Sequence, residues 1–198
     1  MPLRRGTVVS SGFRIGDAVM MREAVLSFWF EDLSPAQWWR ADADLDATIR
    51  ARFGALHEAA VACELFEWRG TPEGRLAEII VLDQFSRNIH RGTPRAFAAD
   101  ALALGLAQEA VALGIDAVLR PPRLAFLYLP CMHSESRRIH EIAVRLFDTP
   151  GLEENLAAEL KHKAIIDRFG RYPHRNAVLG RGSTPEEEEF LRQPGSGF

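Results

Sequence analysis

The sequence predicts an all-α protein, because helix-start signals recur along it and no segment has the pattern of a β-strand. A hydroxyl residue precedes proline at Ser34, Thr71, Thr93, Thr149 and Thr184. The hydroxyl can accept hydrogen bonds from the free N–H groups of a first helical turn, and proline at the first helical position lacks an N–H that would have no partner. No run alternates apolar and polar residues with β-branched enrichment.

The helices are expected where apolar residues recur at steps of three and four. We expect them over residues 22–30, 35–39, 42–64, 72–89, 94–113, 123–129, 134–147 and 153–169, with a final short helix from residue 185. The 72–89 helix carries apolar residues around most of its circumference, so it should be central. Gly114 and Gly170 follow two of the helices and suit left-handed C-terminal caps. Short connections favour antiparallel helical hairpins.

Composition sets the broad class of the protein. Of 198 residues, 47% are hydrophobic and 26% are charged, and the net charge of −3 gives no global basic field, which argues against a nucleic-acid partner. No segment approaches the roughly 20 apolar residues of a membrane helix. Cys63 and Cys131 lie among apolar neighbours and predict buried, reduced thiols in a cytoplasmic protein.

The chain divides into three parts. Residues 1–19 have no apolar run suited to a signal peptide and predict a disordered leader. Residues 20–192 form a single all-α domain or two helical sub-bundles, and residues 193–198 a flexible tail.

Several segments resemble a bacterial family of uncharacterised proteins, the domain of unknown function 924, over about residues 22–191. They are Val-Leu-Ser-Phe-Trp-Phe at 25–30, Trp-Trp at 38–39, Leu-Asp-Gln-Phe-Ser-Arg-Asn at 82–88, Tyr-Leu-Pro at 128–130, Met-His-Ser-Glu at 132–135, and the segments 168–176 and 179–185. The resemblance implies a compact tetratricopeptide-like bundle of about eight or nine helices. It implies no established activity or substrate, so any cofactor stays unknown.

The chain departs from the family pattern at histidines that would otherwise attract attention. An aromatic residue is usual where this chain has His90, and glutamine is usual at His140. We therefore do not take these two as site residues.

The segment 168–176 is the first candidate for a binding site. It includes Arg171, His174, Arg175 and Asn176 in a connection between two expected helices. Arginine forks bind carboxylate or phosphate, which suits a small anionic ligand. The alternative is structural, with the basic groups beside the negative end of the preceding helix and the amide bonded to loop carbonyls. The sequence leaves both open.

Two further groups could contribute chemistry. His133 and Glu135 lie near the start of a helix, and a histidine beside a carboxylate is the minimum for acid–base work. Asp83 and Arg87 are four residues apart on one helical face, where they can pair as an anchor or as part of a pocket. Asn88 either ends that helix or joins the pocket.

A metal site is not predicted. His133 and His140 are about 10 Å apart along a helix, and a site would need His133, His162, His174 and a carboxylate to converge. His162 is more simply a core histidine bonded to a carbonyl. The sequence does not decide whether the protein is an enzyme.

Two hypotheses for function follow. The first is a protein that binds, and could turn over, a small anionic molecule in a polar pocket of arginine, histidine and glutamate. The alternative is a tetratricopeptide-like module that binds a peptide or a protein partner without catalysis. Nothing in the chain resembles a P-loop or a dinucleotide-binding glycine pattern.

Overall fold

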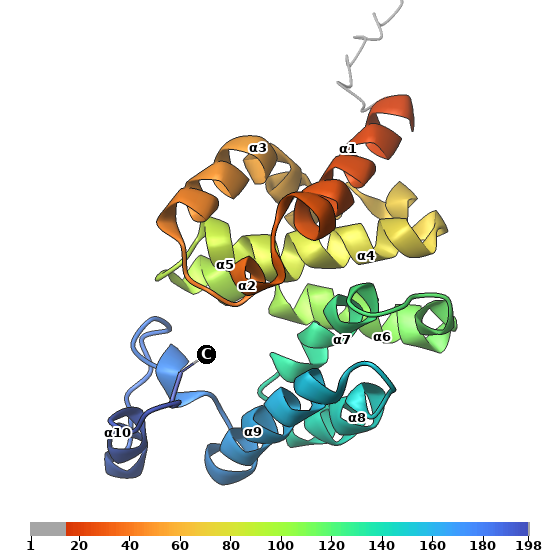
Figure 1. The fold of residues 1–198 in the computed structure, drawn as a ribbon. Coiled ribbons are helices and arrows are strands. Elements are labelled where there is room, and N and C mark those ends of the chain that lie inside the picture. The colour runs from red at the N-terminus through yellow and green to blue at the C-terminus, as the bar shows by residue number, and fades with distance from the viewer. Residues whose placement is uncertain (1–14, 198) are drawn as a thin grey trace, which may run out of the picture.

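The computed structural model describes residues 15–197, and the predicted all-α class is confirmed for them (Figure 1). The α-helices are α1 (Ile15–Ser27), α2 (Pro35–Trp38), α3 (Ala43–Val61), α4 (Pro72–Ile80), α5 (Ser86–Ile89), α6 (Asp100–Ala112), α7 (Arg123–Met132), α8 (Arg137–Phe147), α9 (Glu153–Phe169) and α10 (Pro185–Leu191). Two π-helical segments, η1 (Phe28–Asp32) and η3 (Val81–Phe85), join them, as do the 3₁₀ turns η2 (Phe66–Gly70), η4 (Pro94–Phe97), η5 (Ile115–Ala117) and η6 (Pro173–Arg175).

The expected helix over 72–89 is the centre of the molecule, as predicted. It is observed as α4, η3 and α5 in direct succession, and Ile79, Ile80, Leu82 and Phe85 on it are all fully buried. Its middle is π-helical, a widened turn that is often found at functional sites. This turn carries Asp83, which belongs to the candidate site described below.

Helix boundaries follow the capping signals in most places. Thr184 accepts a hydrogen bond from the backbone N–H of Glu187, whose side chain accepts one from the backbone N–H of Thr184. Gly114 and Gly170 have φ values of 72° and 70° and end their helices in the left-handed conformation. The largest difference from the predicted boundaries in the middle of the chain is at the start of α6. The 94–113 segment begins with a 3₁₀ turn, and α6 starts only at Asp100.

The helices lie in two groups in Figure 1. α1, α3, α4 and α5 lie on one side, α7, α8 and α9 lie on the other, and α6 packs against both α4 and α7. α8 and α9 pack as a hairpin, while α10 lies apart with the segment that precedes it. A core of aromatic side chains joins the groups, since the Trp29 ring meets Phe85 and Phe126 edge-on at 5.6 Å each.

Two predictions concern the ends of the chain. The leader predicted for residues 1–19 lies outside the described residues up to residue 14, and α1 begins at Ile15, earlier than expected. Residue 198 of the predicted tail also lies outside them.

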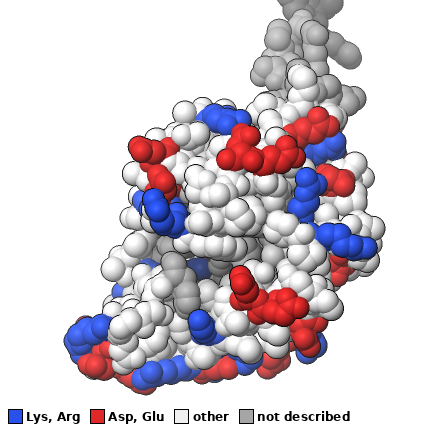
Figure 2. All heavy atoms as spheres, viewed as in Figure 1, with Lys and Arg blue, Asp and Glu red and all other residues white. Residues whose placement is uncertain are grey.

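No helix in the described part of the chain is long and apolar enough to cross a membrane. Figure 2 shows acidic and basic side chains interspersed over one face, without a large area of one sign.

The prediction of two buried thiols is half correct. Cys131 is buried in α7, and burial raises the pKa of its thiol to about 12. Cys63 is exposed, because the chain turns there with a φ of 61° after the end of α3. Its apolar neighbours are no guide to burial here, because Val61 before it is itself 46% exposed at the end of α3.

Candidate functional site

A cavity of about 820 Å³ lies where α2, α5, α7, α9 and the segment around η6 meet. Its polar lining comprises Arg40, Gln84, Arg87, Asn88, Arg91, His133, Glu154, Asn155, His162, His174 and Arg175. Its aromatic lining comprises Trp38, Trp39, Phe97, Phe126 and Tyr172. Such a volume and mixture of walls are typical of small-molecule sites.

An ionic frame holds the polar side of the cavity. The Arg87 guanidinium donates to both carboxylate oxygens of Asp100 at 3.0 and 3.1 Å and lies 3.1 Å from Oδ1 of Asp83. Arg175 donates to the same Asp100 at 3.1 Å and to the backbone oxygen of His133 at 3.0 Å. The frame therefore joins η3, α5, α6, the end of α7 and η6, which are distant in the sequence.

His133 is held against the frame by Asp83. Its Nδ1 lies 2.8 Å from Oδ1 of Asp83, and Gln84 donates to the other carboxylate oxygen at 2.6 Å. Burial acts to raise the pKa of Asp83, but the charge of Arg87 and the contact with His133 outweigh it, so the pKa lies below its usual range. Asp83 is thus an ionised acceptor, which assigns the proton to Nδ1 of His133 and leaves Nε2 unprotonated in the neutral ring.

Burial, reinforced by Arg87, lowers the pKa of His133 despite Asp83. The imidazole is therefore neutral near pH 7. A neutral histidine oriented by a buried carboxylate can accept a proton from a bound molecule.

The predicted pairing of His133 with Glu135 needs correction. Glu135 accepts two hydrogen bonds from Arg181, at 2.6 and 2.8 Å, and one from the backbone N–H of Tyr172 at 2.7 Å. The chain turns between α7 and α8, so the two side chains separate although they are only two residues apart. Glu135 fixes the segment that carries Tyr172, and the carboxylate bonded to His133 is Asp83.

Arg171 and Asn176 do not line the cavity. Arg171 donates to both carboxylate oxygens of Glu187 at 2.6 and 2.7 Å, and the Asn176 amide reaches the same carboxylate at 3.3 Å and Ser183 at 3.1 Å. These contacts fasten the loop after α9 to the start of α10. Their role here is structural, but these contacts go to the side chains of Glu187 and Ser183 and not to the helix end and loop carbonyls of the structural alternative.

His174 and Arg175 do line the cavity, beside Tyr172. The Arg175 guanidinium lies over the rings of Phe97 and Tyr172, with distances of 4.5 and 4.8 Å to the ring centres. The His174 ring lies 5.4 Å from that of Tyr172. Asn88 lines the cavity as well, and its amide donates to Asp46 at 2.8 Å.

The remaining histidines near this region have structural partners. His162 hydrogen-bonds the carbonyl of Ala158 at 2.8 Å and also lines the cavity. His140 is fully buried with Glu159, 2.6 Å from it, and Tyr172 donates its hydroxyl to the backbone oxygen of Met132. Although His133, His162 and His174 line one cavity, the described residues do not place them and a carboxylate close enough to share a metal ion.

Sequence reasoning missed several residues of the site. Asp100 and Arg91 could not be assigned to the site from the sequence, since nothing local distinguishes them from solvated surface charges. The aromatic wall had a signal in the adjacent Trp38 and Trp39, which were used only for the family resemblance. Trp39 is in fact 59% exposed and stacks on Phe126 with the ring planes 7° apart.

These observations define a protein that is helical over its described residues, with a cavity lined by basic and aromatic side chains. The chain matches the model of a family described as bacterial protein of unknown function (DUF924) over residues 25–195, and it belongs to that family. It is also similar to a solved structure of a protein of unknown function from Agrobacterium tumefaciens, with 36% identity and a TM-score of 0.85 over 89% of this chain and 99% of that one. Curated proteins give no match.

Proposed function

We propose that the protein binds a small anionic molecule with a flat ring in the cavity of about 820 Å³. The observation that carries this proposal is the charge of the lining. Among the described residues, the lining has four arginines, Arg40, Arg87, Arg91 and Arg175, and only one carboxylate, Glu154.

The carboxylates that balance these arginines lie behind the wall. Asp83, Asp100 and Asp46 pair with Arg87, Arg175 and Arg91, and none of the three lines the cavity. A molecule in the cavity would therefore meet the guanidinium groups first. Arginine forks suit carboxylate or phosphate groups because they can donate two parallel hydrogen bonds.

Among these arginines, Arg175 would be stabilised most by a bound anion. Only 7% of this residue is exposed, and its Nε has no hydrogen-bond partner in the described part of the chain. Burial lowers the pKa of its guanidinium, although Asp100 acts in the opposite direction. An anion beside it would add a favourable charge and an acceptor for this N–H group.

The aromatic wall would hold the ring of the ligand. The Trp38 indole is fixed by its N–H, which donates to the backbone oxygen of Trp29 at 2.8 Å, and its ring meets Phe126 edge-on at 5.1 Å. Trp39 lies parallel to Phe126 at 5.7 Å. Flat ligand rings gain stacking energy on such surfaces without needing hydrogen bonds.

His133 gives the site a proton acceptor if the bound molecule is converted. Its Nε2 carries the free electron pair while Asp83 holds the opposite nitrogen at 2.8 Å. This is an arrangement for general-base chemistry. It supports catalysis as an extension of binding and does not name a reaction.

Thermal unfolding with defined probes tests the proposal. We expect adenosine monophosphate to raise the Tm more than adenosine or inorganic phosphate alone, because it offers both an anion and a ring. Arg175→Lys and Arg91→Gln should each reduce the shift. Arg168→Gln, on an exposed arginine paired with Glu186, is the matched control and should keep it.

Equal responses in all three variants would contradict the proposal. So would stabilisation by none of these probes together with saturable binding of an unphosphorylated peptide, the result expected of an interaction module. Arg91→Gln keeps the test decisive if Arg175→Lys does not fold, because the Arg91 side chain is 43% exposed.

A further inference from the structure

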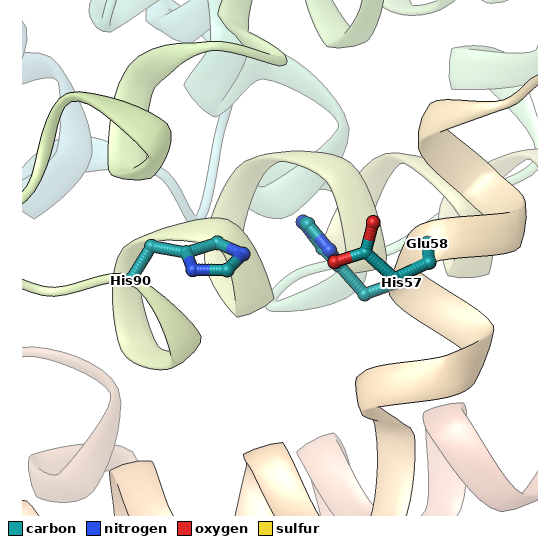
Figure 3. A group of neighbouring side chains, drawn as sticks. All are labelled: His57, Glu58 and His90. Atoms are coloured by element: carbon teal, nitrogen blue, oxygen red, sulfur yellow. The ribbon is translucent and has the colours of Figure 1, made fainter.

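A second group of chemically active side chains lies outside the cavity, where α3 passes the end of α5. His57 and Glu58 are in α3, and His90 follows α5 directly. One potential ligand atom from each lies within 4.8 Å of those of the other two. Figure 3 shows the two imidazole rings facing one another with the Glu58 carboxylate beside them, and the ring centres are 5.2 Å apart.

Hydrogen bonds determine which nitrogen of His57 carries its proton. The Ser86 hydroxyl donates to the backbone oxygen of Leu82 at 2.5 Å, so its oxygen accepts from Nε2–H of His57 at 2.7 Å. The other nitrogen, Nδ1, then has a free electron pair. Metal-binding histidines are commonly oriented in this way, by a hydrogen bond from the nitrogen that does not bind the metal.

The two remaining imidazole nitrogens have no hydrogen-bond partner among residues 15–197. Nδ1 of His57 and Nε2 of His90 are both buried and make no hydrogen bond. His57 is only 3% exposed. A buried polar atom without a partner costs free energy, and two of them on adjacent rings indicate that a further group belongs between them.

We propose that His57, His90 and Glu58 bind one divalent transition-metal ion of the zinc class. Two imidazoles and one carboxylate are a ligand set that suits zinc, and three protein ligands leave a fourth position open for water or another molecule. None of the three residues lines the cavity, so this site is separate from the proposed anion site and does not depend on it.

Two local features set the cost of binding. Ligand atoms around one zinc ion are ~3.4 Å apart for bond lengths of ~2.1 Å, so any two of the three atoms that lie near the 4.8 Å limit of the group must move closer. Glu58 must also leave Arg95, which donates to it at 2.6 Å. That pair is about 60% exposed on both sides, and exposed pairs contribute little stability.

Arg50 is the other cation beside the group. Its guanidinium donates to the backbone oxygen of Ile89 and so is fixed next to His90. A dication must overcome its repulsion together with that of Arg95. Removing Arg95 should therefore tighten metal binding, a result that a purely structural histidine pair would not give.

The test is a calorimetric titration of the full chain with Zn²⁺ alone, and with Co²⁺ as a probe whose visible absorption reports coordination. We expect one ion per chain. His57→Gln and His90→Phe should each weaken binding by more than the ~10–100-fold that loss of an outer partner costs, and Ser86→Ala by about that amount. His90→Phe introduces the aromatic residue that the family pattern has there, which favours a folded variant. Arg95→Ala should tighten binding.

His133→Gln is the matched control, a histidine variant in the separate cavity, and should bind the metal like the unaltered protein. Circular dichroism confirms that each variant is folded. The proposal is overturned if the unaltered protein binds no Zn²⁺ in the micromolar range, or if His90→Phe binds it equally well. Loss of binding in His133→Gln would also overturn it, because that result would place the ion in the cavity.

Discussion

Nδ1 of His133 lies 2.8 Å from Oδ1 of Asp83, which is 50 residues earlier in the chain. The contact joins the end of α7 to the π-helical turn in the central helix. Asp83 is only 1% exposed and also contacts Arg87 and Gln84. One buried carboxylate thus orients the histidine, neutralises part of the cavity wall and links two helices.

Replacing Asp83 by Asn should destabilise the protein. The change leaves Arg87 with less compensating charge in a buried position, and breaking a buried pair in this way costs about 3 kcal/mol. Urea denaturation measures the loss. Glu109→Gln is the control, because Glu109 is 52% exposed in its pair with Arg75 and should change stability by less than ~1 kcal/mol. Equal effects of the two changes would show that the Asp83 network contributes no more than a surface pair.

The affinity of the cavity for an anion should increase as the pH falls. Burial and Arg87 lower the pKa of His133, while Asp83 and Asp100 act to raise it, and the net direction is down from the usual 6.5. An anion bound beside the ring would raise that pKa, so binding takes up a proton. The affinity begins to rise when the pH falls to the pKa of His133 in the complex. It stops rising once the pH is below the pKa of His133 in the free protein.

Inorganic sulfate is the probe for this prediction, since it keeps one charge state through this range. Its affinity is measured by calorimetry at several pH values. His133→Gln should remove most of the dependence. A variant that retains the full slope would assign the proton to another group.

The Arg171–Glu187 pair should stabilise the fold only above acidic pH. Hydrogen bonds from Arg171, opposed by burial, lower the pKa of Glu187 to about 2 from 4.5. A lowered pKa in the folded state means that the contribution is complete above the unfolded value and is lost as the pH falls from about 4.5 toward 2.

Thermal melts of the unaltered protein and of Glu187→Gln test this over that range. The difference in Tm should be constant near neutral pH and should shrink as the pH falls below 4.5. A difference that does not change with pH would assign the effect to packing at Thr184 rather than to the charge.

Gly74 should tolerate no side chain. A Cβ at this position would lie 1.9 Å from the backbone oxygen of Trp68, which cannot move without displacing η2. We expect Gly74→Ala to cost about 1–3 kcal/mol, the usual range for overpacking. Gly54→Ala, in α3 with nothing within 4 Å of the added carbon, is the control and should stabilise by about 0.5–1 kcal/mol. Chemical denaturation compares the two.

The helices could be predicted because their signals are local. Caps such as Thr184 with Glu187, glycines such as Gly170, and apolar spacing act within a turn or two of the chain, so a single sequence contains them completely. The π-helical turn at 81–85 could not be predicted in the same way. Its wider geometry changes which face Asp83 occupies, and only packing from several helices decides that.

The candidate site also has a part that the sequence predicts and a part that depends on tertiary contacts. The sequence singled out His133, Asp83, Arg87 and Arg175 by residue type and by resemblance, and they meet in one region. It paired His133 with the nearer carboxylate, Glu135, because proximity along the chain was the only distance available. It had no means to include Asp100, whose contact with Arg175 spans 75 residues.

What the sequence alone determined is therefore the helical class, most helix ends and the family. The tertiary structure decided which charges are partners, which of them line a cavity and which merely fasten a loop. The physical reason is the separation along the chain over which each interaction acts. Capping and periodicity depend on neighbours in the chain, whereas burial and ion pairing depend on groups brought together only after the helices have packed.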